Sequence, residues 1–108
     1  RVGLEPDTIS YNAAISACEK AAQWRPALHL LAQMPRATLQ LDTVTCNSAI
    51  GACEKAYQWH LALKLFMKMM KEQVEVDIIT YNILLDALHG HALALDVFCK
   101  ALQGGHYP

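Results

Sequence analysis

The sequence predicts an all-α fold, a solenoid of stacked antiparallel helical hairpins, and three observations lead to this prediction. An Asp-x-x-x-x-Asn pattern begins at Asp7, Asp42 and Asp77, so both intervals are 35 residues. Apolar residues recur at helical spacing in both halves of each interval. No alternating run of Val and Ile with the length of a strand is bounded by turn residues. A fixed period of this size indicates repeated units that each pack on their neighbours.

The first half of each unit carries one apolar stripe at positions i, i+3, i+4 and i+7, which predicts an amphipathic helix. The stripe residues are Tyr11, Ala14, Ile15 and Cys18, then Cys46, Ala49, Ile50 and Cys53, then Tyr81, Leu84, Leu85 and Leu88. Ser10, Thr45 and Thr80, or the Asp three residues before each, can cap these helices.

The second half of each unit repeats the same offsets and predicts a second helix. Its stripe residues are Ala27, Leu30, Leu31 and Met34, then Ala62, Leu65, Phe66 and Met69, then Ala94, Val97, Phe98 and Ala101. The interval from Ala62 to Ala94 is 32 residues rather than 35. We therefore expect the third unit to have lost three residues in the turn between its helices, around Gly90.

These patterns divide the chain into four segments. Residues 1–7 would end a preceding unit, residues 8–42 and 43–77 would be full units, and residues 78–108 would be a shortened unit with a C-terminal tail. Because the first residue is Arg and no signal peptide is evident, we expect a fragment of a longer array.

Composition excludes several classes of protein. A hydrophobic content of 54% excludes disorder, and charged residues interrupt every apolar run before it could cross a membrane. The formal charge of −1 provides no general attraction for phosphate, so any contact with nucleic acid must be local. We find no nucleophile with its own base, no glycine-rich phosphate loop and no converging carboxylates. The sequence therefore predicts a non-enzyme without a cofactor.

The cysteine and histidine residues also lack the spacing of a metal site. Cys18, Cys46, Cys53 and Cys99 contain no CxxC pair, so we interpret all four as reduced structural thiols. His89 and His91 lack a third ligand, which argues against a metal.

The unit resembles the pentatricopeptide repeat. Each begins with an aliphatic residue, Ser or Thr, Tyr or Cys, and Asn, and its second helix carries an Ala-Leu-x-Leu-Phe-like pattern. A tetratricopeptide unit has a period near 34 and places Trp in its first helix. Here Trp24 and Trp59 fall at the turn between the helices, where we expect them to anchor the hairpins rather than stack on bases.

The resemblance implies sequence-specific binding of single-stranded RNA, one base per repeat, by side chains of the first helix. In the family, the Asn after the Tyr and the last residue of the repeat choose the base, and an aliphatic residue packs on it. The matching residues are Asn12 with Asp42, Asn47 with Asp77, and Asn82 without a partner in this chain; Ile9, Val44 and Ile79 would pack on bases, and Lys20 and Lys55 would meet phosphates.

Helical geometry is compatible with this assignment. At about 100° per residue, Asn12, Ser16 and Lys20 fall away from the apolar stripe, as do their equivalents Asn47, Gly51 and Lys55, so we expect them to face outward. Lys64, Lys68 and Lys71 would form a solvated outer face of a second helix.

By the same resemblance, Asn with Asp favours uracil, with cytosine second, so the two complete pairs predict 5′-UU in an RNA of a chloroplast or mitochondrion. Two other interpretations remain open. Asn and Asp near a helix start are also ordinary capping residues. A helical scaffold that binds another protein in the same groove is the alternative function.

Overall fold

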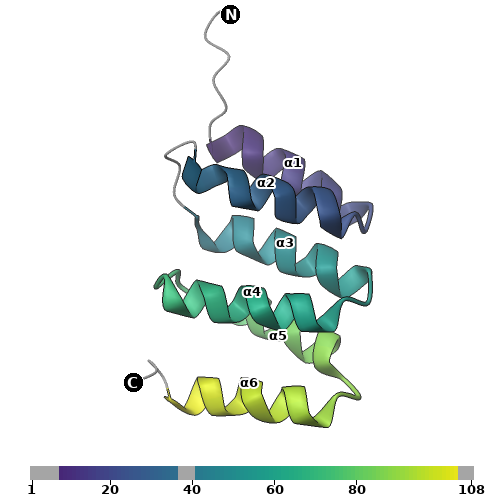
Figure 1. Ribbon diagram of the computed structural model, residues 1–108, viewed down its shortest axis with the longest axis vertical. Coiled ribbons are helices and arrows are strands. Elements are labelled where there is room, and N and C mark those ends of the chain that lie inside the picture. Colours follow the sequence, from purple (N-terminus) through teal and green to yellow (C-terminus); the bar gives the residue numbers. More distant parts are fainter. Residues whose placement is uncertain (1–7, 37–40, 105–108) are drawn as a thin grey trace, which may run out of the picture.

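The computed structural model describes residues 8–36 and 41–104, and these residues form six α-helices and no strand (Figure 1). The helices are α1 (Thr8–Lys20), α2 (Trp24–Arg36), α3 (Thr43–Lys55), α4 (Trp59–Lys71), α5 (Ile78–Leu88) and α6 (Ala92–Gly104). They form three successive hairpins stacked in chain order, as Figure 1 shows. The all-α solenoid predicted from the period is confirmed.

The helix α3 lies at the centre of the stack. It packs against α1 and α5, the first helices of the neighbouring hairpins, and against α2 and α4. Its residues Ala49 and Ala52 belong to a core cluster with Ile15 of α1, whereas Ile50 and Cys53 belong to a second cluster shared with the later helices. Both cores therefore include residues of this one helix.

The apolar stripes are buried with a few exceptions. Ala14 is exposed, and at the C-terminal end of the stack Leu85 and Val97 are 48% and 46% exposed. Ile50, the equivalent of Leu85, is fully buried because α3 has a hairpin on both sides. Cys99 is also exposed, so its interpretation as a structural thiol is wrong, whereas Cys46 and Cys53 are buried.

The structure shows which residues cap the first helices, the Ser or Thr residues or the Asp three residues before each. Asp42 and Asp77 occupy the N-cap positions of α3 and α5, with extended backbone, and their carboxylates accept hydrogen bonds from the amides of Thr45 and Thr80. The Asp three residues before the hydroxyl residue is therefore the cap in both helices. Asp7 lies outside the described residues.

The shortening of the third unit lies in its two helices rather than in the turn between them. The turns within the hairpins span three residues each, 21–23, 56–58 and 89–91, whereas α5 has 11 residues and α1 and α3 have 13. Reversing the chain needs a positive-φ residue after each first helix, supplied by Ala22, Tyr57 or Gly90. Because α5 can end two residues earlier without losing this positive-φ residue, two of the three missing residues are missing from α5. The third is missing at the start of α6, where Ala94 is the third helical residue whereas Ala62 is the fourth of α4.

Candidate nucleic-acid interface

Asn47 lies in a polar contact between α3 and α5. Its Nδ2 donates a hydrogen bond to Asp77 Oδ1 at 3.1 Å, and its Oδ1 accepts one from Thr80 Oγ1 at 2.5 Å. The side chain is only 7% exposed, and the expectation that it faces outward is wrong. The structure does bring together Asn47 and Asp77, the two members of one predicted base-reading pair.

The equivalent contact between α1 and α3 is built differently. The hydroxyl of Thr45 donates to Asn12 Oδ1 and lies 2.7 Å from Asp42 Oδ1. The Thr45 amide also donates to Asp42 Oδ1, so Asn12 and Asp42 both contact Thr45. Asn12 is half-buried at this junction. Asn82 occupies the same place on α5 at the end of the stack and is exposed.

The three aliphatic candidates lie exposed in the first turns of α1, α3 and α5. Ile9 is 78% exposed, Val44 63% and Ile79 54%. Each is three residues before the Asn of its unit. Leaving β-branched side chains in water at the same position of three helices is unfavourable for folding alone, so this row is available to a ligand with an apolar face.

The two candidate phosphate-binding lysines differ in their surroundings. Lys20 is exposed at the end of α1. Lys55 is also exposed, but its Nζ forms an ion pair with Glu19 Oε2 of the preceding hairpin at 3.2 Å. Gly51 was expected to face outward with Lys55, but it is buried because the side chain of Glu19 lies over it.

Electrostatics keep Asp77 charged at this interface. Hydrogen bonds from the Thr80 amide and then from the Asn47 side chain lower the pKa of Asp77 below its usual value. The carboxylate is therefore an acceptor for the Asn47 amide at neutral pH. By contrast, burial raises the pKa of Cys46 to about 12 and that of Cys53 to about 11, so both remain neutral thiols that pack in the core.

The tryptophans anchor the hairpins. Trp24 is the first residue of α2 and packs against both core clusters. Trp59 is the first residue of α4, and its ring stacks on that of His91 at a centroid distance of 4.5 Å. Among residues 8–36 and 41–104, no three His, Cys, Asp or Glu side chains are grouped so that they could hold a metal ion.

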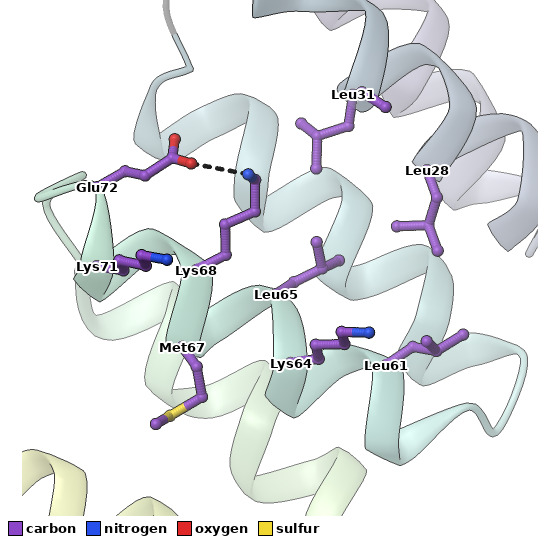
Figure 2. A pocket seen from close by; sticks show the side chains of 10 residues that line it. Leu28, Leu31, Leu61, Lys64, Leu65, Met67, Lys68, Lys71 and Glu72 are labelled. Carbon is purple, nitrogen blue, oxygen red and sulfur yellow. Dashed lines mark hydrogen bonds and ion pairs between the residues drawn. The ribbon is translucent and has the colours of Figure 1, made fainter.

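A separate groove lies between the second helices α2 and α4 (Figure 2). It has a volume of about 630 Å³ and an apolar floor that includes Leu28, Leu31 and Leu65. Lys64, Lys68 and Lys71 line its α4 side, and Lys68 pairs with Glu72 at 2.7 Å. The expected solvated face of α4 is therefore also the wall of a groove, on the opposite layer from Asn12 and Asn47.

The sequence pattern did not assign a role at the interface to Thr45 and Thr80 beyond capping. Their recurrence at a 35-residue interval, always three residues after Asp, was the available signal. Glu19 was missed for another reason, since its partners Gly51 and Lys55 belong to the next unit.

Stacked two-helix hairpins with a repeated polar contact between first helices define a helical-repeat protein of the α-solenoid class. The family model of the PPR repeat family matches residues 6–53 and 41–90. The chain belongs to this family, which confirms the resemblance read from its repeats. No curated protein matched the sequence. None of the described helices has the length and apolar character needed to cross a bilayer.

Proposed function

We propose that this chain binds single-stranded RNA along its layer of first helices, with one base at each junction between units 8–42, 43–77 and 78–108. The observation that carries the proposal is the recurrence of an exposed aliphatic side chain beside an amide and a carboxylate. Ile9, Val44 and Ile79 offer surfaces for base stacking, and Asn12 and Asn47 offer edge contacts.

The base preference follows from the family pairing. Asn12 with Asp42 and Asn47 with Asp77 favour uracil, with cytosine second, so the preferred sequence is 5′-UU. Asn82 would read a further base with a partner from a following unit. The carboxylates also cap helices, so capping and base reading are two roles of one side chain. The setting we infer is a chloroplast or mitochondrion, with a role in RNA processing, stability, editing or translation and no catalysis by these residues.

The test uses a longer array that contains these units, because contacts worth about 1–3 kcal/mol per base give weak binding over two bases. Binding is measured to RNAs that carry U, C, A or G at the two matched positions. Changing Asn12→Thr and Asn47→Thr should shift the preference from uracil toward guanine, the base that the family associates with Thr and Asp. Lys64→Thr on the opposite layer is the control and should leave the preference unchanged.

A protein-binding scaffold is the second candidate, and the groove between α2 and α4 favours it. Its apolar floor and lysine wall fit an amphipathic helix with acidic residues, which would lay its apolar face on Leu28 and Leu65. If the Asn variants bind all four RNAs in the same ratios as the parent array, base reading is wrong and the scaffold function takes its place.

A further inference from the structure

Thr45 and Thr80 occupy the same place at two successive junctions. Each is the third residue of its helix, follows its capping Asp by three positions and is fully buried. A cap needs only the carboxylate and the backbone amide, which Asp42 and Asp77 already satisfy. The Thr80 oxygen also accepts a hydrogen bond from the Asp77 amide at 3.3 Å, which completes a capping box. An accepted bond leaves the hydroxyl hydrogen available, and this hydrogen can be donated to the preceding unit.

At the second junction, the hydroxyl fixes the orientation of an amide. Thr80 Oγ1 lies 2.5 Å from Asn47 Oδ1 and 3.0 Å from Asp77 Oδ1, and a hydroxyl has one hydrogen to donate. Both contacts join two oxygen atoms, and two oxygen atoms only 2.5 Å apart need a hydrogen between them, so we assign the hydrogen to the shorter contact. Asn47 Nδ2 then donates to Asp77 Oδ1. Rotating this amide by 180° would set its oxygen against the Asp77 carboxylate.

When the amide is held in this orientation, one N–H and one lone pair of Asn47 remain unused by the contacts with Asp77 and Thr80, and they face in fixed directions. A freely rotating amide would present both orders and discriminate less between base edges. The first junction depends still more on the hydroxyl. There the Thr45 hydroxyl donates to Asn12 Oδ1 and the Thr45 amide donates to Asp42 Oδ1, and no direct bond between Asn12 and Asp42 is found among the described residues.

We propose that Thr45 and Thr80 are positioning residues that determine base specificity. Each orients the Asn of the preceding unit, so the base read at a junction depends on Asn, Asp and Thr together. This inference rests on the proposed RNA function. It predicts that a unit with Val at this position reads its base less selectively, even with the same Asn and Asp.

The experiment compares Thr80→Val, which removes the hydroxyl, with Thr80→Ser, which keeps it. Oligo(U), oligo(C) and oligo(A) hexamers are titrated into the 108-residue chain and followed by NMR, which tolerates weak binding. Thr80→Val should lower the ratio of U to A affinity by about three- to tenfold, the value of one neutral hydrogen bond. Thr80→Ser should restore the parent ratio. Thr43→Val is the matched control, because it removes a neighbouring hydroxyl that bonds the Glu75 carbonyl rather than Asn47.

The outcomes separate the two proposals. A parent chain that binds the three hexamers equally contradicts RNA base reading, and the positioning role falls with it. A parent preference that is unchanged in folded Thr80→Val, or an equal weakening for every RNA, contradicts the positioning role alone. If Thr80→Val does not fold, the test is made by NMR on the parent chain. We expect a slowly exchanging Thr80 hydroxyl proton close to the Asn47 amide, and its absence overturns the proposal.

Discussion

Glu19 on α1 lies directly over Gly51 on α3, so that a Cβ atom on Gly51 would be 2.9 Å from Glu19 Oε2. The same carboxylate pairs with Lys55 across the junction between the first two units. Gly51, in the middle of α3, thus leaves room for the Glu19 side chain of the preceding unit.

The effect of Gly51→Ala on stability should distinguish the helix propensity of residue 51 from its contact with Glu19. Alanine gains about 1 kcal/mol over glycine inside a helix, but in the parent chain Glu19 must move and weaken its ion pair. We expect a gain close to 1 kcal/mol in a Glu19→Ala background and a smaller one in the parent. Urea unfolding of the four proteins measures the difference. An equal gain in both backgrounds would mean that Glu19 does not occupy the space over Gly51.

Ile50→Ala tests the central core. Ile50 is fully buried, so the change should lower the free energy of unfolding by about 2–5 kcal/mol. Leu85→Ala, at the equivalent but 48% exposed position, should cost clearly less. Thermal melts compare the two. A similar loss for both would contradict the difference in burial between the middle and the end of the stack.

Tyr57→Gly should stabilise the chain. Tyr57 has a φ of 60° in the turn after α3, and its side chain is 89% exposed. A residue other than glycine in this region costs about 1 kcal/mol, and little burial would be lost. We expect the free energy of unfolding to rise by about 0.5–1 kcal/mol. Ala56→Gly, one residue earlier at a φ of −92°, is the control in denaturant unfolding and should give no gain.

The stability of the contact between α3 and α5 should depend on pH, because Glu54 on α3 lies near Asp86 on α5. Burial, and then the charge of Asp86, raise the pKa of Glu54 above its ordinary value of 4.5. The native state therefore holds this proton more tightly than the unfolded chain, and the contribution of Glu54 to stability falls as pH rises from about 4.5 through the raised pKa.

Asp86→Asn should consequently raise the melting temperature at pH 7 and raise it less at pH 4, where Glu54 holds its proton and the charge of Asp86 no longer opposes a second charge. Melts of the parent and variant at both pH values are the measurement. The control is Asp96→Asn, which removes a carboxylate paired with Lys100 on α6. A gain from Asp86→Asn that is the same at both pH values would show that its charge does not act on Glu54.

Lys20 and Lys55 should differ in RNA binding. Lys20→Ala should weaken all sequences alike and reduce the slope of log affinity against log salt by about one. Lys55→Ala should reduce the slope less, because Glu19 already offsets this charge. Titrations at several salt concentrations in the longer array compare them. Equal slopes for the two variants would contradict the difference drawn from the ion pair.

The sequence by itself determined the repeat, the helical class and the order of the hairpins. These follow from the period and from apolar stripes such as that of Tyr11 and Ile15, which report the local phase of a helix. The helical phase also limited the possible capping residues to Ser or Thr, or the Asp three residues before each. Asn47 and Asp77 could be paired only through the family resemblance, since they are 30 residues apart.

Only the tertiary structure decided which polar residues are covered. A helical wheel separates Asn47 and Gly51 from the stripe of their own unit, but it contains no information about the neighbouring units. In the stack, α5 covers Asn47, Glu19 reaches over Gly51, and Leu85 stays exposed where the stack ends. Burial at these positions depends on how separate helices are set against one another, which a periodicity within one helix does not encode.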